Sequence, residues 1–581
     1  MGNFTTSPGV TLNEVDQTYL SGQPVQAGAA IIGPTVKGPV EIPTVVTSYS
    51  EYKNIFGDVL TSGSDVYSYL TSITAYNYFN YGGKSLIVAR VASGSFTSAT
   101  SSFVGDNALF VTDGYVQPGY VAASSSRNLF QLETISEGII MNNDVRNVDD
   151  VLINGTPDNI HFQITSPNTA SGTFNVLVRQ GNDLENKKLI IESFNGVSLD
   201  PKAPTYIAKV IGDQTYNYNS STNQMEIEGS FPNRSKYIRV AQVNVTTPDY
   251  LDSQGKPKAA YVDDIPAAQL GTFGGATGTF AAGANFYHNI NSTNTQGLVA
   301  SNYDNMINLL SNRDEFRFNL LVAPGLTSNL HTAKINTIIS NTQERGDSLF
   351  IADLTDYNGT VGDAITQAQA IDNSYVASYW PWLNIVDPAT GKYVWVPAST
   401  LIPGVYANND NISAPWFAPA GINRGGLSTV LRAQYKLTQG QKDDLYTNNI
   451  NPINTFPKQG VVVFGQKTLQ KGNSALDRVN VRRLLIELKG YIGQLADNIV
   501  FEQNTSQTRF SFTNKVDPYL KSIQQRQGLY AYKIVMDESN NGPDVIDRNQ
   551  LVGQIYIQPT RTAEFISLDF VLLPTGANFP S

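Results

Sequence analysis

The three histidines of the sequence, His161, His288 and His331, are the residues best suited to metal binding or acid–base chemistry. A histidine metal site needs a second histidine or a carboxylate at a fixed short spacing, as in the H-x-x-x-H pattern on one helix face. None of the three has a neighbour at such a spacing. We therefore expect them to be surface or internally hydrogen-bonded side chains, and we expect no metal and no cofactor.

Other catalytic patterns are also missing from the sequence. It contains no cysteine, which removes disulfides, cysteine zinc sites and cysteine nucleophiles, and it has no G-x-S-x-G nucleophile elbow. The glycine-rich run Gly271–Gly283 lacks the Gly-Lys-Ser/Thr ending of a phosphate-binding loop and is better interpreted as a linker or hairpin. Adjacent acids such as Asp263-Asp264 and Asp443-Asp444 are typical of solvated turns. The sequence thus indicates a protein that is not an enzyme.

Four tryptophans lie in one short region: Trp380, Trp382, Trp395 and Trp416. Exposed aromatic rings can form a sugar-binding platform, so a carbohydrate-binding protein is one hypothesis. Packing in a core or at a subunit contact is the favoured alternative, because prolines throughout the region make the segment rigid and folded back.

The composition is that of a large, acidic, globular chain. Its 581 residues are too many for one core, so about two to four domains are expected. The net charge of −10 argues against nucleic acid as a principal ligand, because phosphate binding needs clustered lysine and arginine. No stretch approaches the roughly 18 apolar residues of a transmembrane helix, and the N-terminus lacks the pattern of a signal peptide. We expect no membrane partner.

The longest periodic stretch is Ser474–Ile499, in which apolar residues recur at i, i+3, i+4 and i+7. This spacing predicts one amphipathic helix of about seven turns, with Ser474 as its N-cap and Asp477 in its first turn. Arg482 and Arg483 are adjacent on it and therefore point about 100° apart. One of them can pair within the chain while the other faces a partner.

The rest of the chain predicts an α/β multidomain protein. Before about residue 95, a strand beginning at Ala29 is followed by helices at Tyr49–Phe56 and Val66–Tyr81 and a strand at Ser85–Val91. From about residue 300 onward, strands and helices alternate again, which predicts parallel βαβ units. The expected elements there are strands at Asn319–Ala323, Ser348–Asp353, Tyr375–Trp380, Tyr393–Pro397 and Gly460–Gly465, and helices at Thr332–Thr342 and Val361–Ala370.

Between these parts, strand-like runs alternate with turn residues, which predicts an inserted β-rich domain of sandwich or barrel type. The predicted divisions are an N-terminal extended arm (1–26), an α/β part (27–95), the inserted β-rich domain (96–265), a middle α/β domain (266–420), a C-terminal core domain (421–560) and a C-terminal arm strand (561–581).

Both ends of the chain contain a run that alternates apolar and polar residues, Val10–Val15 and Ala563–Leu573. A lone strand near a terminus cannot bury itself, so each must pair with a sheet edge in its own chain or in a neighbouring one. The candidate contact residues on the two runs are Val10, Leu12, Val15, Phe565, Ile566, Leu568 and Phe570.

The run Asn451–Lys489 contains Asn451-Pro452-Ile453, then Gly465-Gln466-Lys467-Thr468-Leu469 after a strand, and then the helical Asp477–Leu484 (DRVNVRRL). These ordered motifs resemble the C-terminal domain of the contractile tail sheath proteins of myovirus-type bacteriophages. Further segments that match the family are Ser7–Val10, Gly33-Pro34, Gly38-Pro39, Glu192–Pro201, Tyr379–Pro388, Trp416–Gly421, Phe501–Asn504, Gln527–Tyr530, Asp537–Asn541, Pro543–Asp547 and Pro559–Phe565. One turn departs from the family pattern, with Asn408-Asn409-Asp410 in place of Arg-Thr-Asp.

The resemblance implies a structural, self-assembling protein with an α/β sheath core and extended terminal arms. Subunits of this family stack as hexameric rings around a tail tube, and contraction drives the tube through the host envelope for genome delivery. The implied partners are further copies of the chain, joined by strand addition through the arms, and the tail tube, baseplate and tail terminator proteins. Arg482 and Arg483 become candidate contacts with the tube or a neighbour.

The implied location is the virion tail sheath, assembled in the host cytoplasm. The sheath of a phage-derived secretion system or bacteriocin is an alternative that the sequence does not separate from a phage tail.

Overall fold

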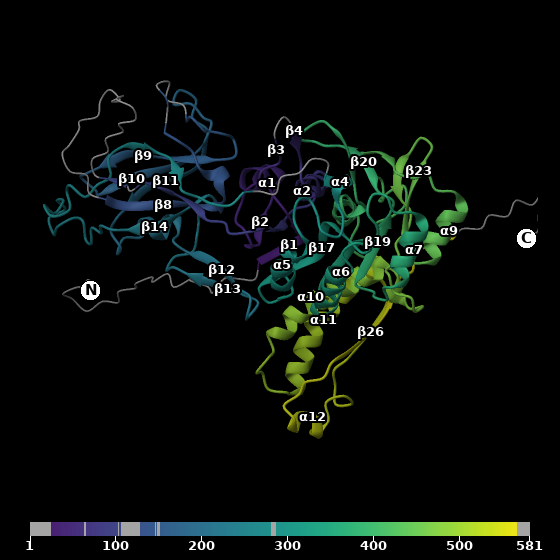
Figure 1. The fold of residues 1–581 in the computed structure, drawn as a ribbon. Coiled ribbons are helices and arrows are strands. Elements are labelled where there is room, and N and C mark those ends of the chain that lie inside the picture. The colour runs from purple at the N-terminus through teal and green to yellow at the C-terminus, as the bar shows by residue number, and fades with distance from the viewer. Residues whose placement is uncertain are drawn as a thin grey trace, which may run out of the picture. The chain divides into compact units, whose positions relative to one another are not determined.

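The computed structural model describes residues 25–62, 65–102, 104–105, 128–145, 147, 152–279 and 286–565. These residues belong to two compact units (Figure 1). Unit one takes its residues from 1–60, 84–283 and 297–321, and unit two from 61–83, 284–296 and 322–581. Helices and strands are mixed along the chain, which confirms the predicted α/β character.

In the first part of unit one, strand β1 (Val25–Gly33) pairs in parallel with β5 (Leu86–Arg90), and Ala29 lies opposite Leu86. Strand β2 (Thr44–Val46) pairs antiparallel with β5. Helix α1 (Tyr49–Phe56) begins after Ser48, whose hydroxyl accepts a hydrogen bond from the Glu51 amide, and ends at Gly57 with a φ of +72°. The predicted bounds of α1 are confirmed, and β5 is one residue shorter at each end than predicted.

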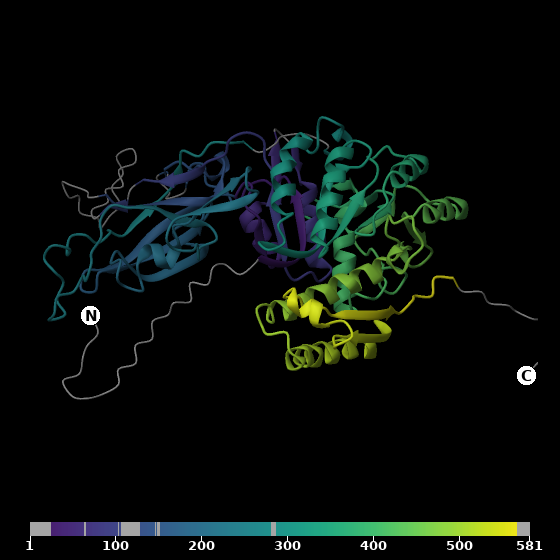
Figure 2. The same cartoon turned by 90° about the horizontal axis from the view of Figure 1, so that it is seen from below.

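The remainder of unit one contains two antiparallel sheets that share an apolar core (Figure 2). One has the order β11-β10-β9-β15, and the other has the order β14-β8-β6-β16 with β7 also paired to β8. Phe130 of β8 stacks on Phe174 of β10 with ring centroids 5.7 Å apart, and Phe162 of β9 packs 5.5 Å from Phe273 of β16. Each aromatic pair therefore joins the two sheets.

The strands of the two sheets are β6 (Ser98–Ser101), β7 (Val104–Gly105), β8 (Asn128–Glu137), β9 (Ile160–Asn168), β10 (Thr173–Gln180), β11 (Ile190–Ser198), β14 (Ile238–Val243), β15 (Gln269–Gly271) and β16 (Phe273–Gly274). The helices α3 (Ile207–Ile211) and α5 (Asp304–Leu309) and the hairpin of β12 (Thr215–Asn219) and β13 (Gln224–Glu228) complete the unit.

The glycine-rich run Gly271–Gly283, expected to be a linker or hairpin, contains strands of both sheets in its described part. It holds the end of β15 and all of β16, which complete the two sheets beyond the predicted limit at residue 265. Glycine is needed at Gly271 because a β-carbon there would lie 2.1 Å from the ring of Phe162.

Unit two contains the predicted alternation of strands and helices. β18 (Leu349–Asp353) pairs in parallel with β19 (Val376–Trp380), β19 pairs in parallel with β23 (Asn451–Phe456), and β24 (Gly460–Val463) pairs antiparallel with β23. Strand β17 (Phe316–Thr327) is divided between the units and runs past the Pro324-Gly325 turn at which the predicted strand ends.

A separate antiparallel sheet of unit two has the order β21-β20-β22. The strands of this sheet and the other elements of the unit are β20 (Leu383–Val386), β21 (Tyr393–Val396), β22 (Val430–Ala433), β4 (Asp65–Tyr67), α2 (Leu70–Asn80), α4 (Phe286–Asn289), α6 (Thr332–Arg345), α7 (Val361–Gln369), α8 (Ile402–Ile412), α9 (Gln439–Thr447), α10 (Val479–Asp497), α11 (Ser506–Gln525), β25 (Leu529–Val535), α12 (Pro543–Asp547) and β26 (Gln554–Pro559). None of the helices in the described residues has the length and apolar content needed to span a bilayer.

The predicted helix Ser474–Ile499 is wrong at its start. Ser474 caps only the short turn Ala475–Asp477, Arg478 is extended, and α10 begins at Val479. Backbone hydrogen bonds hold this segment open, because the Thr468 amide donates to Asp477 (3.0 Å) and the Val479 amide donates to Gln466 (2.8 Å). These strand-like contacts outweigh the local helical preference.

The shared core of the two sheets predicts a large effect for Phe174→Ala. The ring is fully buried against Phe130, so its loss should lower the free energy of unfolding of unit one by about 3–5 kcal/mol. Urea unfolding followed by hydrogen-exchange mass spectrometry on peptides from β8 and β10 measures this unit. Ile190→Ala, at a half-exposed position in β11, is the control. Equal midpoints for the two variants would contradict a core shared by the sheets.

Candidate assembly site

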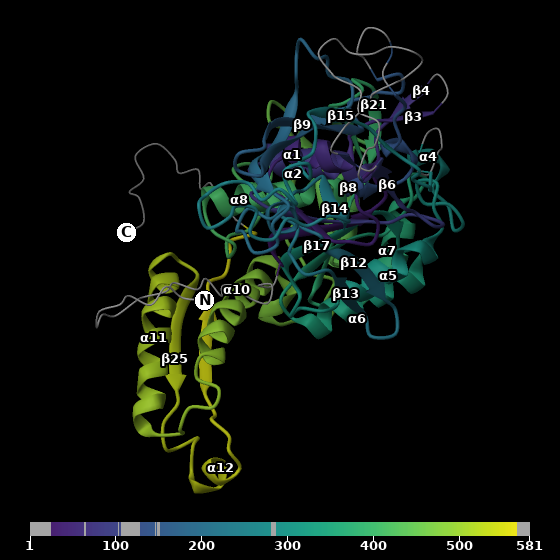
Figure 3. The same cartoon turned by 90° about the vertical axis from the view of Figure 1, so that its left-hand side faces the viewer.

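Strands β25 and β26 form an antiparallel ribbon that α10 and α11 cover on one face (Figure 3). Leu529 is buried, and Tyr532 and Ile557 lie opposite each other and are half-buried against the same apolar cluster as Leu484 and Leu520 of the helices. Side chains thus alternate along both strands, with one face of the ribbon on the helices and one in solvent.

The ribbon has two open edges within the described residues, where neither β25 nor β26 pairs with a third strand. A two-stranded sheet is marginal by itself, and unpaired backbone amides and carbonyls at an edge are a template for another strand. Several apolar residues of α10, and Ile499 just after it, belong to the same cluster and are also only half-buried: Leu485, Ile492, Leu495 and Ile499. The helices therefore offer a wider apolar surface than two strands cover.

The chain that leaves β26 is fixed at Glu564. One carboxylate oxygen accepts hydrogen bonds from Arg478 Nε (2.8 Å) and Gln466 Nε2 (3.0 Å), and the other accepts from Arg478 Nη2 (3.0 Å) and the Tyr446 hydroxyl. Gln466 also donates to the hydroxyl of Thr562. We call Glu564, Arg478, Tyr446 and Gln466 the arm anchor. It joins the last described residues to the segment that precedes α10.

Electrostatics favour the charged form of the arm anchor. Burial by itself raises the pKa of Glu564, but hydrogen bonds from Tyr446, Arg478 and Gln466 outweigh it, and the pKa lies below its usual value. Burial, together with the hydrogen bond to Glu564, raises the pKa of the Tyr446 phenol, which therefore stays a donor. The bidentate arginine–carboxylate pair also fixes direction, because both partners are planar.

Phe565, the first of the predicted C-terminal contact residues, is 83% exposed and meets Tyr446 edge-on with ring centroids 6.4 Å apart. It thus stands directly beyond the arm anchor. The other predicted arm residues lie outside the described residues: Val10, Leu12, Val15, Ile566, Leu568 and Phe570.

Arg482 and Arg483 diverge as predicted, and both are buried in unit two. Arg483 makes a bidentate ion pair with Asp410 of α8 (Nη1–Oδ1 2.9 Å, Nη2–Oδ2 2.6 Å). The Arg482 guanidinium lies 3.9 Å from the ring centre of Tyr375 and donates to Ser374. The two side chains are 4% and 3% exposed, so they hold α10 in place within the unit. A contact of either arginine with a tube or a neighbour stays a prediction.

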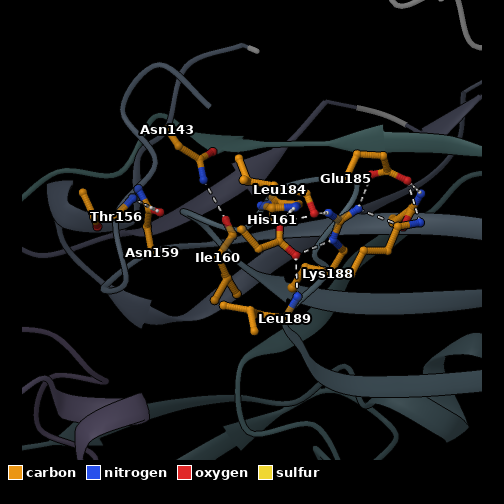
Figure 4. Close-up of polar contacts among 12 residues, drawn as sticks. Asn143, Thr156, Asn159, Ile160, His161, Leu184, Glu185, Lys188 and Leu189 are labelled. Atoms are coloured by element: carbon orange, nitrogen blue, oxygen red, sulfur yellow. Dashed lines mark hydrogen bonds and ion pairs between the residues drawn. The ribbon is translucent and has the colours of Figure 1, made fainter. Parts of the chain in front are cut away.

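His161 belongs to a buried ion network in the β-rich part of unit one (Figure 4). Its Nε2 lies 3.1 Å from Asp183, which also accepts two hydrogen bonds from Arg179 (2.8 and 2.9 Å). Arg179 in turn reaches Glu185 at 2.7 Å. Burial alone would raise the pKa of Asp183, but hydrogen bonds from His161 and Arg179 lower it to about 2.

The other candidate chemical groups are also held in structural contacts. His331 Nδ1 accepts from the Thr327 amide (3.1 Å), and His288 is exposed beside Tyr287. Across the described ranges, no cluster of three or more histidine or acidic side chains is arranged to hold a metal ion. Trp380, Trp382 and Trp416 are buried, as the packing alternative requires, whereas Trp395 is partly exposed.

The ion network predicts a pH-dependent effect for Asp183→Asn. The substitution removes the ion pair between Asp183 and the buried Arg179. The free energy of unfolding at neutral pH should therefore fall by about 3–5 kcal/mol. Because the folded pKa of Asp183 lies below its ordinary 3.8, the carboxylate stabilises the fold above pH 4 and loses this contribution as the pH falls toward 2.

The difference between wild type and Asp183→Asn should therefore shrink by on the order of 2 kcal/mol between pH 4 and pH 2. Urea unfolding at a series of pH values measures it. Asp249→Asn, in an exposed ion pair with Lys202, is the matched control and should change stability little at any pH. A constant difference between wild type and Asp183→Asn across this range would contradict the assignment.

Two family models together match half of the chain. One is described as the phage tail sheath protein central domain and matches residues 281–469. The other is described as the phage tail sheath C-terminal domain and matches residues 471–572, which include the β25–β26 ribbon and Glu564.

Curated relatives carry the same description. The chain is 39% identical over 225 residues to the tail sheath protein of Vibrio phage KVP40, covering 39% of this chain and 34% of that protein. It is 42% identical over 185 residues to the tail sheath protein of Enterobacteria phage T4, covering 32% of this chain and 28% of that protein. The matches thus span about a third of the length of these relatives.

Among solved structures, a sheath tail protein from Listeria innocua is similar over 92% of this chain and 95% of its own, with 10% identity and a TM-score of 0.49. At that score the likeness adds no weight to the sequence matches.

Proposed function

Because the chain belongs to the family of phage tail sheath proteins, we propose that it is the sheath subunit of a contractile phage tail. Copies stack as hexameric rings around a tail tube, and the sheath shortens to drive the tube through the host envelope and deliver the genome. The observation that carries this proposal is the β25–β26 ribbon, with its two open edges beside a partly uncovered helix surface.

Strand addition from neighbouring copies is the connection that fits these edges. A third strand would bring main-chain hydrogen bonds worth about 0.5–1.5 kcal/mol each, and its alternate apolar side chains would cover the half-buried residues of the ribbon. The sequence offers such side chains at Ile566, Leu568 and Phe570 in one arm and at Val10, Leu12 and Val15 in the other.

The arm anchor would determine where the C-terminal arm leaves its own subunit. With Glu564 bound to Arg478, the chain is fixed up to this residue, and the part that can reach a neighbour begins near Phe565. Such an anchor keeps an exchanged strand from pulling β26 off β25 when subunits rotate relative to one another.

The proposed partners are further copies of this chain, the tail tube protein, and the baseplate and tail terminator proteins. The proposed location is the virion tail, after assembly in the host cytoplasm. The same residues would also serve the sheath of a phage-derived secretion system or bacteriocin. Purification of the native particle with or without a DNA-filled capsid distinguishes the two.

Deletion of residues 566–581 tests the role of the C-terminal arm. The full chain should polymerise into striated tubes. The deleted chain should stay folded because the arm anchor is complete, and it should remain a soluble monomer because it has no arm strand to add to a neighbour. Negative-stain electron microscopy and size-exclusion chromatography measure polymerisation, and thermal unfolding measures the fold. Long tubes from the deleted chain would contradict strand exchange through this arm.

Glu564→Ala tests the arm anchor separately. It removes the partner of Arg478 at a partly exposed site, so the fold should lose only about 1–2 kcal/mol, but hydrogen exchange in residues 554–565 should quicken and tubes should form less readily. Glu538→Ala, at an exposed acid of unit two, is the control. Normal tubes together with fast exchange in residues 554–565 would show that the anchor does not direct the arm.

A further inference from the structure

We propose that the loop Val500–Glu502 of one copy inserts into an aromatic-lined pocket on unit two of another copy. This contact would join subunits at a surface separate from the terminal arms, in addition to the strands that the arms supply. It rests on the proposed function in one respect, since the chain must assemble with itself.

The loop between α10 and α11 exposes the side chain of Phe501 in a strained backbone conformation, which lowers the stability of the isolated chain. The Glu502 amide donates to the Ile499 carbonyl (3.1 Å), which closes a tight turn, and Phe501 within it has a φ of +71°. Glycine would adopt this left-handed conformation without strain, whereas phenylalanine does so rarely. Phe501 is 102% exposed and Val500 is 58% exposed. The described part of the chain therefore gives the ring no cover that would offset the strain.

The pocket is a cavity of about 380 Å³ between β4 and the hairpin of β20 and β21. Its walls include Tyr67, Tyr287, Tyr393 and Trp395, and the Tyr393 side chain is 71% exposed. An apolar cavity of about 150 Å³ is enough for a benzene molecule, so this one can hold a phenylalanine ring and a neighbouring aliphatic side chain.

The pocket is held in shape before any partner arrives. Asp387 accepts hydrogen bonds from the Ala389 amide (3.0 Å) and the Thr390 hydroxyl (2.6 Å), which fixes the turn between β20 and β21. Lys392 donates to the Val66 carbonyl (3.2 Å) and so ties that hairpin to β4. Preformed walls lower the entropic cost of binding.

Charge favours the loop as the occupant of the pocket. Two exposed cations border it, Lys392 in its lining and Arg432, whose guanidinium lies 5.2 Å from the ring centre of Trp395. Two exposed acids border the loop, Asp497 and Glu502. Apolar side chains with acidic neighbours thus match an aromatic pocket with basic neighbours. A sugar is a poorer fit, because both carboxylate oxygens of Asp387 already accept hydrogen bonds from the turn.

Loop and pocket lie at opposite ends of unit two. The α10–α11 loop is at the end that carries α12, and β4 and β21 are at the other end (Figures 1 and 3). A chain therefore cannot fill its own pocket with its own loop. Two complementary patches at opposite ends of one subunit make a head-to-tail contact, which repeats from copy to copy in a ring or helix.

Cysteine cross-linking tests the contact directly, since the chain has no native cysteine. Val500→Cys and Tyr393→Cys chains, both of which keep Phe501, are mixed, polymerised and oxidised with copper phenanthroline. A dimer band is expected on non-reducing gels from the mixed tubes, and not from either variant alone or from unpolymerised chains. Tubes that yield no mixed dimer would overturn the proposal, whereas failure of wild-type chains to form tubes would overturn the proposed function instead.

Substitutions separate assembly from folding. Phe501→Gly should raise the melting temperature of the monomer by relieving the left-handed backbone, yet raise the concentration needed for tube formation about tenfold or more, as loss of a central aromatic anchor does. Arg432→Glu should weaken assembly, and Arg432→Glu with Glu502→Arg should restore it. Unchanged assembly of Phe501→Gly, or no rescue by the charge exchange, would overturn the proposal.

Discussion

The β25–β26 ribbon has only two strands, and this incompleteness is the constraint on which the proposed assembly depends. Helices α10 and α11 bury one of its faces, but two strands cannot cover the apolar surface that the helices present. Such a surface is unfavourable in water at roughly 25 cal/mol per Å². The free subunit thus has a structural reason to accept a further strand, and any such strand must come from a segment with alternating apolar residues.

Two arginine–carboxylate pairs make this incomplete ribbon a defined acceptor. Arg483 and Asp410 hold α10 against α8, and Arg478 and Glu564 hold the end of the described chain against the start of α10. Each pair is bidentate between two planar groups, so it restricts the position of its helix or chain segment more than it adds to net stability. The acceptor surface includes α10, and the start of the donor arm is consequently fixed to the residue that directly precedes this helix.

The sequence predicts helices and strands correctly where the apolar residues recur with a clear period. It does not predict features that depend on contacts with residues far away in the chain. α1 and α7 were predicted almost to their ends, whereas α11 was missed because its apolar residues are sparse and Pro518 interrupts it. The late start of α10 depends on hydrogen bonds from residues 466–468. The direction of the two arginines follows from helix geometry, but their burial depends on Asp410 and Tyr375, far away in the chain. Glu564 had one available signal, since it and Arg478 both lie in segments that match the family.

The two proposed contacts between copies differ in what they tolerate. Added strands are held by main-chain hydrogen bonds along a flexible arm, so they can persist while subunits rotate. The inserted loop depends on a preformed pocket and a short turn, so it fits one relative position of two subunits only. A sheath that uses both would keep its subunits connected through the arms throughout contraction, and the loop contact would add to the stability of one packing, that of the assembled tubes. The strain at Phe501 then has a function, because a side chain that destabilises the free subunit can be retained where it stabilises one state of the lattice.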